Sequence, residues 1–304
     1  MIILNFRGIW SPMPTPFGAR SELDLDRSRE LVDYLVDGGV DGLFPLGTTG
    51  EFALMSREER RKIVDTVVDQ TNDRVPVLCG VSDPSLANVR AFALDAKDSG
   101  CDGVVATPPY YFKATGAEEC YSYFKTVAES TDLPLFVYNI PEWTGTLVPV
   151  EVVARLADED LIAGMKYTEY NLLNLLMYIR AAGERIPIFT GSDAMAYTNL
   201  EFGGAGAVVA VSNVAPRETS SIFDLHSRGD HQGARRAQMK LLPAIEAIGM
   251  GSFPSELKEA MKLVGMPVGG VRVPLGPLSE EQRMAVKRLL AEAGLQTLKK
   301  EGES

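Results

Sequence analysis

Residues 133–167, LPLFVYNIPEWTGTLVPVEVVARLADEDLIAGMKY, contain one complete repeat of the predicted fold. The runs LPLFVYN and LIAGMKY at its two ends are short, apolar and rich in residues that favour strands, and a helical pattern separates them. A strand, a helix and a second strand in this order form a βαβ unit, in which the two strands lie parallel. The stretch therefore predicts a parallel sheet covered by helices.

The same kind of apolar run occurs eight times. The intervals of roughly 20 to 35 residues each leave room for one helix and its loops, which is the spacing of a closed (β/α)8 TIM barrel. An open, doubly wound sheet would instead need a glycine fingerprint after the first strand, where this chain has Pro12, Pro14 and Pro16. The runs are GIWSP near Ile9, GLFPLG near Phe44, VPVLCG near Val77, DGVVATPP near Val105, LPLFVYN near Phe136, LIAGMKY near Met165, IPIFTGS near Phe189 and GAVVAVSN near Val209.

The C-terminal part of the chain is predicted to be helical. After the eighth run strand signals stop, and a capping pattern at Ser279–Gln282 resembles the earlier one at Ser56–Glu59. We expect a barrel core in residues 1–215, and the last barrel helix with a helical extension in residues 216–304. No flexible linker divides them, so we expect one domain, in which the extension covers one side of the barrel. Residues 299–304 are expected to fray.

Composition and charge limit the class of protein. The chain has 304 residues, 45% of them hydrophobic, and a net charge of −11, which disfavours binding to nucleic acid or to an anionic membrane. It has no long apolar run, and the opening MIILNFRG is too short for a signal peptide, so we expect a cytoplasmic protein with small-molecule partners. Cys79, Cys101 and Cys120 lack metal-site spacing and are expected to be buried thiols.

Histidine chemistry is nearly excluded. The chain has two histidines, His226 and His231, in a polar helical stretch where both are expected to be solvated surface residues. A Ser-His-Asp or Cys-His mechanism, or a zinc site rich in histidine, would need a histidine near a nucleophile or ligand cluster. Catalysis would therefore use lysine, tyrosine, threonine or carboxylates.

Polar residues at the carboxyl ends of barrel strands are the candidates for chemistry. Lys166 follows the apolar run 161–165, so we expect it to face the barrel interior, where apolar surroundings disfavour the charged amine and favour a Schiff-base nucleophile. The alternative is an ion pair at the rim. The glycine-rich turn Gly47–Glu51 is either a cradle for a small carboxylate or an ordinary loop.

Three further strand ends supply tyrosines and an aspartate. Tyr138 closes the fifth strand, and Tyr110 and Tyr111 follow the fourth. Each tyrosine alone is more often a packing residue, but beside a lysine a phenol hydrogen-bonded to a threonine hydroxyl can carry protons. We expect Ser192 or Asp193 to cap a helix first and to contact substrate second.

The order and spacing of five motifs resemble one known family. GTTGE at Gly47, TPPYY at Thr107, YNIPEWTG at Tyr138, GMKYT at Gly164 and GGAGAVVAVSNVA at Gly203 are similar to those of the dihydrodipicolinate synthase / N-acetylneuraminate lyase family of class I aldolase barrels. The likeness runs from about Ile9 to Arg217.

The resemblance implies a mechanism without a cofactor or metal. Lys166 would form an imine with the C2 carbonyl of pyruvate or another 2-keto acid, and Tyr138 would shuttle the proton. Thr49 would relay it toward Tyr111, which in the family reaches across from a neighbouring subunit of a homotetramer built from dimers. The substrate contacts implied are the backbone of Thr48 and Thr49, with Gly47, Trp143, Asp193 and Val208.

Two departures from the family bear on the substrate. Trp143 stands where the synthases keep an arginine for the carboxylate of the aldehyde, and Ala194 stands where sialic acid lyases have a glutamate. We therefore expect cleavage or dehydration of a 2-keto-3-deoxy sugar acid or 4-hydroxy-2-oxo acid, with Thr144, Asp193 and Ser212 as candidates to bind its hydroxyls. The alternatives are condensation of pyruvate with aspartate semialdehyde and a non-catalytic barrel that binds a 2-keto acid.

Overall fold

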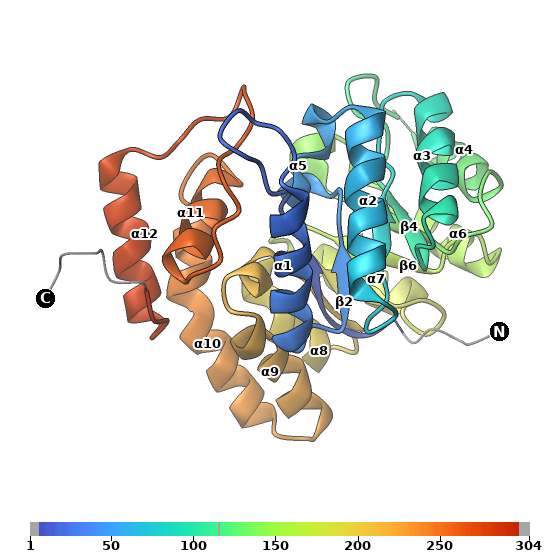
Figure 1. Cartoon of the computed structure of the whole chain (residues 1–304). Coiled ribbons are helices and arrows are strands. Elements are labelled where there is room, and N and C mark those ends of the chain that lie inside the picture. Colours follow the sequence, from blue (N-terminus) through green and yellow to red (C-terminus); the bar gives the residue numbers. More distant parts are fainter. Residues whose placement is uncertain (1–5, 115, 298–304) are drawn as a thin grey trace, which may run out of the picture.

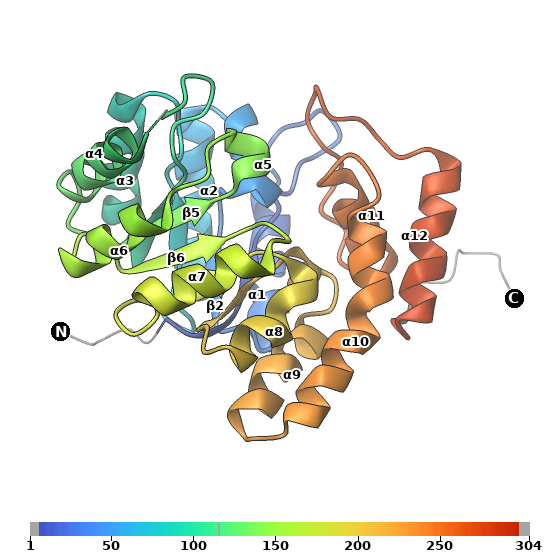
Figure 2. The same cartoon turned by 180° about the vertical axis from the view of Figure 1, so that it is seen from behind.

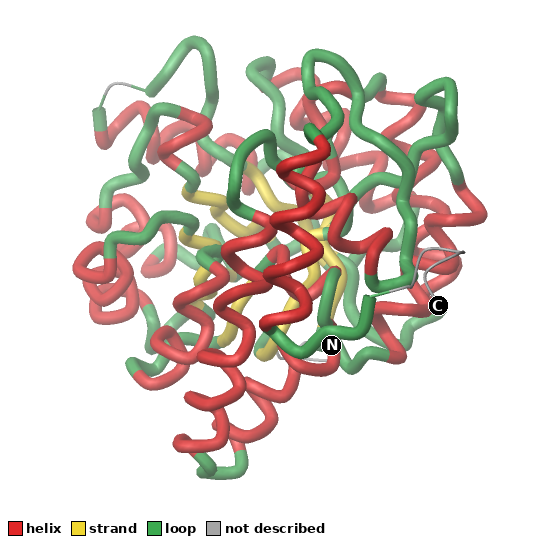
Figure 3. The backbone as a smooth tube through the Cα atoms, turned by 90° about the vertical axis from the view of Figure 1, so that its left-hand side faces the viewer, coloured by secondary structure: helices red, strands yellow, loops and turns green. Residues whose placement is uncertain are grey.

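All eight predicted strands are present and parallel. The computed structural model describes residues 6–114 and 116–297, so the expected fraying of residues 299–304 lies outside the described part. The strands form one sheet, seen in yellow at the centre of Figure 3. Their bounds are β1 Gly8–Pro12, β2 Gly42–Phe44, β3 Leu78–Gly80, β4 Gly103–Ala106, β5 Leu135–Asn139, β6 Gly164–Tyr167, β7 Ile188–Thr190 and β8 Gly206–Val208.

The sheet closes on itself. Its strand order is β2-β1-β8-β7-β6-β5-β4-β3, and the two edge strands meet where Leu43 bridges Val77 and the Gly80 backbone N–H donates to the Pro45 carbonyl at 3.0 Å. This closure confirms the predicted barrel and excludes the doubly wound sheet.

Helices surround the barrel (Figures 1 and 2). The capping boxes at Ser56 and Ser279 begin α2 and α12 as the sequence predicted. Within residues 6–114 and 116–297, no helix is both long enough and apolar enough to span a membrane. The helix bounds are α1 Leu25–Asp37, α2 Arg57–Thr71, α3 Leu86–Asp98, α4 Ala117–Ala128, α5 Pro141–Thr144, α6 Val150–Asp158, α7 Leu172–Ala182, α8 Ala196–Glu201, α9 Pro216–Ser227, α10 His231–Ile248, α11 Ser255–Leu263 and α12 Glu280–Glu292.

Alternate residues of each strand fill the barrel interior. Large aromatic side chains on one strand pack over glycines on the next, so a Cβ at Gly42 would lie 2.4 Å from the Trp10 ring and one at Gly164 would lie 2.2 Å from the Phe136 ring. The interior cluster comprises Trp10, Phe44, Leu78, Val105, Phe136, Tyr138, Ile140, Phe189, Ala205 and Val208. Since β6 has Gly164 facing inward, Lys166 two residues later faces inward as well.

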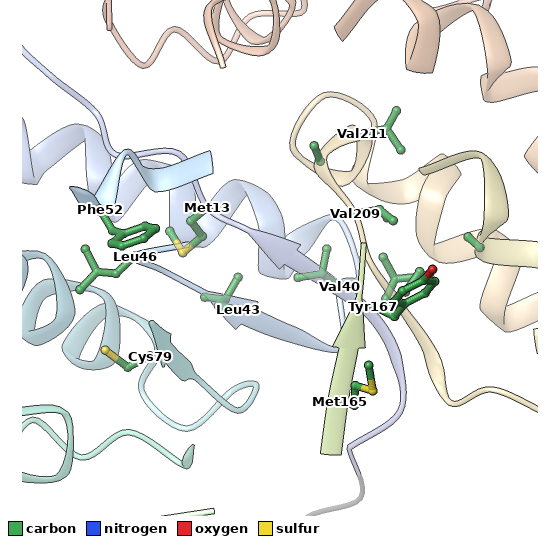
Figure 4. Close-up of a cluster of buried hydrophobic side chains, with 14 of the residues drawn as sticks. Met13, Val40, Leu43, Leu46, Phe52, Cys79, Met165, Tyr167, Val209 and Val211 are labelled. Carbon is green, nitrogen blue, oxygen red and sulfur yellow. The ribbon is translucent and has the colours of Figure 1, made fainter. Parts of the chain in front are cut away.

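The other face of the strands packs against the helices. Leu43, Met165 and Tyr167 belong to this larger core, part of which Figure 4 shows. Cys79, Cys101 and Cys120 are buried free thiols, as the sequence predicted.

The C-terminal helices α10, α11 and α12 lie along one side of the barrel (Figures 1 and 2). A buried ion pair links them to the turn after β2: Lys258 Nζ on α11 lies 2.6 Å from Glu51 Oε1. Lys258 also donates to the Thr15 and Gly270 carbonyls, and the Arg272 backbone N–H donates to the other Glu51 oxygen at 2.8 Å. Desolvation lowers the pKa of Lys258 and Glu51 opposes that shift. The extension therefore fixes the Gly47–Glu51 turn.

Removing one partner of this ion pair is predicted to destabilise the protein. Lys258→Met leaves the Glu51 carboxylate buried without its cation, which costs on the order of 3–5 kcal/mol. The double variant Glu51→Gln/Lys258→Met should recover part of that loss, because no charge remains buried. Urea denaturation measures both. Lys262→Met, an exposed lysine one turn further along α11, is the control and should leave the midpoint unchanged. Equal midpoints for Lys258→Met and Lys262→Met would contradict the prediction.

Candidate active site

The register of two neighbouring strands places the predicted nucleophile beside the predicted proton carrier. Tyr138 on β5 is paired with Lys166 on β6. The Lys166 amine lies 4.3 Å from the centroid of the Tyr138 ring and 5.2 Å from that of the Phe44 ring, and the lysine is 6% exposed. Aromatic faces therefore surround the amine, as expected for a lysine that points into the barrel.

Lys166 is not held at the rim by a carboxylate. Among the residues that the structure describes, its nitrogen forms no ion pair and faces the Tyr138 and Phe44 rings instead. Glycine at position 191 leaves room for the lysine stem, because a Cβ there would lie 2.7 Å from Lys166 Cε and 1.9 Å from Thr168 Oγ1. The amine is left free for a substrate.

The hydroxyl beside Tyr138 belongs to Thr48. Thr48 Oγ1 lies 3.4 Å from the Tyr138 phenol oxygen, across the mouth from the turn after β2. The resemblance implied Thr49 as the relay partner of Tyr138, whereas the structure brings the Thr48 hydroxyl to the phenol. The cause is local geometry: Thr48–Gly50 form a 3-10 turn, in which successive side chains point in different directions, and Glu51 ends it in the left-handed region at φ 56°.

A cavity of about 920 Å³ opens above Lys166 and Tyr138 at the carboxyl ends of the strands. Of the predicted residues, eight line it: Thr48, Thr49, Tyr138, Trp143, Lys166, Ser192, Asp193 and Val208. Gly47 lies outside the lining, where it begins the 3-10 turn. Tyr111 is also outside it, 84% exposed on the loop after β4 and in edge contact with Phe112.

Asp193 differs from its expected role as a helix cap. Its carboxylate accepts a hydrogen bond from the Val211 backbone N–H at 2.6 Å, across to the turn after β8. The Ser192 hydroxyl donates to the Glu169 carbonyl, so neither side chain caps the short turn at Asp193–Met195. Burial raises the pKa of Asp193 to about 6, and the nearby Lys166 charge opposes that rise.

Two candidates for binding substrate hydroxyls point elsewhere. The Thr144 hydroxyl donates to the Ile140 and Thr146 carbonyls on either side of α5, and Ser212 is fully buried, where it bonds Ser11 and the Val209 carbonyl. Thr168 instead lines the cavity with a buried hydroxyl that has no hydrogen-bond partner among the described residues. Hydroxyls already satisfied by the backbone are not available to a ligand.

Several lining residues were not predicted from the sequence. Glu169 and Tyr170 follow β6, and Ile245, Ile248 and Phe253 come from the C-terminal extension. The extension therefore forms part of the cavity wall as well as packing against the barrel. Trp143, 54% exposed on α5, also lines a second cavity of about 220 Å³ with Phe52, Tyr110 and Phe253.

The charges around the large cavity are mostly negative. Glu142, Glu169 and Asp193 line it together with a single cation, Lys166, among the residues that the structure describes. Glu169 is held by the Tyr167 hydroxyl and lies 3.4 Å from the Asn174 amide nitrogen. A second anionic group on a substrate would therefore meet carboxylates and no arginine.

Residues 5–293 match the model of the dihydrodipicolinate synthetase family. The chain belongs to this family. It is 36% identical over 292 residues to an uncharacterized DapA-like lyase of Halobacterium salinarum, covering 96% of this chain and 95% of the relative. It is 33% identical over 290 residues to the 4-hydroxy-tetrahydrodipicolinate synthase of Syntrophus aciditrophicus, covering 95% and 99% of the two chains.

Solved structures of dihydrodipicolinate synthetase family members have the same fold. YagE, a prophage protein of Escherichia coli K12 crystallised with pyruvate, superposes with a TM-score of 0.92 at 33% identity, covering 95% of this chain and 99% of YagE. A dihydrodipicolinate synthase superposes with a TM-score of 0.91 at 33% identity, covering 95% and 100%. The family assignment confirms the resemblance of the motifs and makes the protein an enzyme, a lyase of the Schiff-base type. The non-catalytic alternative is wrong.

Asp193→Asn is predicted to change how stability depends on pH. The folded state holds the Asp193 proton up to about pH 6, whereas an unfolded aspartate loses it near pH 4. Deprotonation therefore removes stability from the wild type as the pH rises between those two values. Asparagine does not titrate, so relative to wild type the variant should gain on the order of 2 kcal/mol between pH 4 and pH 7.

Urea denaturation of both proteins across this range measures the difference. Asp26→Asn, at an exposed aspartate of α1, is the matched control and should follow the wild type. Parallel curves for Asp193→Asn and wild type would show that the Asp193 carboxyl is not held protonated.

Proposed function

We propose that the protein forms an imine between the Lys166 amine and the C2 carbonyl of pyruvate, or of a 2-keto acid that contains the pyruvyl group. The observation that carries this proposal is an unpaired lysine amine 4.3 Å from the Tyr138 ring, below an open cavity. Nitrogen attacks the carbonyl carbon, the carbonyl oxygen leaves as water, and the resulting imine stabilises a carbanion at C3. That carbanion serves both bond cleavage and bond formation.

We propose that Tyr138 and Thr48 move the proton that each of these steps requires. Their oxygens are 3.4 Å apart, a distance that closes to a hydrogen bond with a small side-chain movement. The backbone of the turn at Gly47–Thr49 is the proposed holder of the substrate carboxylate, since Thr48 and Thr49 line the cavity beside Tyr138.

The favoured substrate is a 2-keto-3-deoxy sugar acid or a 4-hydroxy-2-oxo acid, which the enzyme would cleave or dehydrate. The distal half of such a substrate is neutral and hydroxylated. A group of this kind fits the cavity, which Glu142, Glu169 and the indole of Trp143 line. Carboxylates accept hydrogen bonds from hydroxyls, and an indole face packs on C–H groups. The Thr168 hydroxyl is a further candidate contact.

A second candidate is the condensation of pyruvate with aspartate semialdehyde. It is favoured by the 33% identity to proteins named 4-hydroxy-tetrahydrodipicolinate synthase. Trp143 and the acidic mouth oppose it, because the carboxylate of that aldehyde would have no cation to bind.

We also propose a cytoplasmic homotetramer of one-domain subunits, built as a dimer of dimers. Tyr111 and Phe112 support this assembly, since they are 84% and 82% exposed and the Tyr111 backbone takes a φ of 73°, which is unusual for a residue other than glycine. In the assembly Tyr111 would complete the proton path of a neighbouring subunit.

Lys166→Ala is predicted to abolish the imine. The wild type, incubated with pyruvate and reduced with borohydride, should gain the mass of one reduced pyruvyl group per chain, and the variant should gain none because its nucleophile is absent. Intact-mass spectrometry measures the adduct. Lys62→Ala, at an exposed lysine on α2, is the control and should be modified like the wild type. An adduct of equal yield on Lys166→Ala would disprove the assignment.

Trp143→Arg is predicted to shift the enzyme toward condensation. A new arginine–carboxylate pair contributes about 1.5–3 kcal/mol, so kcat/KM with aspartate semialdehyde should rise about 10- to 150-fold. Cleavage of the 2-keto-3-deoxy sugar acid should fall as the indole contact is lost. Steady-state assays of both reactions, with Trp143→Gln as the uncharged control, measure the change. Efficient condensation by the wild type with no sugar-acid turnover would overturn the proposed substrate and leave the imine intact.

A further inference from the structure

The two histidines of the chain meet at one carboxylate, and none of the three residues lines the cavity above Lys166. His231 Nδ1 lies 2.7 Å and His226 Nε2 lies 3.5 Å from Glu201 Oε1. The two imidazole rings are 4.8 Å apart between centroids and stand at 89° to each other. A chain with only two histidines thus brings both to the same side chain.

The expectation of two solvated surface histidines is confirmed for His231 but not for His226, which is partly buried. Glu201 ends α8, His226 lies in the last turn of α9, and His231 begins α10. The three helices gather at one end of the molecule, at the bottom of Figures 1 and 2. His231 is 54% exposed at its side chain and His226 only 20%, so the cluster is open to solvent on one side.

The spacing of the three groups suits a single metal ion. One ligand atom from each side chain can be chosen so that all three lie within 4.8 Å of one another. A tetrahedral ion that holds its ligands at about 2.0–2.2 Å keeps them about 3.4 Å apart. Small rotations of the three side chains would bring their ligand atoms to this separation. A water molecule can take the fourth coordination position of the ion.

An aromatic ring lies beside the cluster. The Tyr197 ring is 6.4 Å from that of His226 between centroids and stands at 75° to it. Both imidazoles approach the same carboxylate oxygen, Glu201 Oε1. The three candidate ligands therefore already converge on one point.

We propose that Glu201, His226 and His231 bind one divalent transition-metal ion of the class that prefers imidazole ligands, with Zn²⁺ as the probe. Two nitrogen donors and one carboxylate select this class over Mg²⁺ and Ca²⁺, which require mainly oxygen ligands. The ion would tie α8, α9 and the start of α10 together. The other end of α10 supplies Ile245 and Ile248 to the cavity wall, so the site lies on an element that shapes the active site.

The test uses the full chain, untagged and treated with a chelator, because an affinity tag would add histidines. Calorimetric titration with Zn²⁺ should give one equivalent per chain with a dissociation constant of micromolar order. His226→Ala and His231→Ala should each weaken binding at least tenfold. Glu246→Gln, at an exposed carboxylate elsewhere on α10, should bind like the wild type. Mg²⁺ should not bind at the same concentrations.

A second readout is independent of any activity. With two histidines in the chain, the imidazole region of the NMR spectrum contains two sets of ring resonances, and Zn²⁺ should move both together at one equivalent. Binding weaker than millimolar, binding that persists in the double variant His226→Ala/His231→Ala, or a shift confined to one histidine would each overturn the proposal.

Discussion

The closed parallel register of the barrel determines where every important side chain points. Residues alternate between the barrel interior and the helices. Phe136 and Gly164 therefore form the interior layer beneath the active site, and Tyr138 and Lys166 form the layer directly above it. A shift of β6 by one residue relative to β5 would send Lys166 into the helical layer and away from Tyr138. The same packing that forms the core therefore produces the site.

The two buried lysines of the described chain have different roles because their surroundings differ. Lys258 has the Glu51 carboxylate and two carbonyls around its ammonium group, so its charge is fully compensated. Lys166 has aromatic faces and an open cavity. The first lysine holds the turn that presents Thr48 to Tyr138, and the second is free to react. The C-terminal extension thus acts on the site through Glu51 as well as through its own lining residues.

Much of this arrangement could be predicted from the sequence, because it depends on local periodicity. The eight apolar runs predicted the strands, and the position of Lys166 after its run predicted its inward direction. The roles that could not be predicted depend on contacts between distant segments. Asp193 bonds to Val211, Ser212 turns to Ser11, and Phe253 reaches the cavity from the extension. Choosing between Thr48 and Thr49 needed the 3-10 turn itself, and nothing in the spacing of two histidines and one glutamate indicated that they meet.

The central claim is that an imine at Lys166 exchanges protons through Tyr138 and Thr48, whatever the second substrate is. The most direct measurement is the exchange of the pyruvate C3 protons for deuterium in D2O, followed by NMR without any aldehyde present. We predict catalysed exchange by the wild type, and a loss of about 10² or more in Tyr138→Phe, the usual range for a general acid–base group. Thr48→Val should be impaired more than Thr49→Val. Exchange at the wild-type rate in Tyr138→Phe, or in Lys166→Ala, would contradict the account.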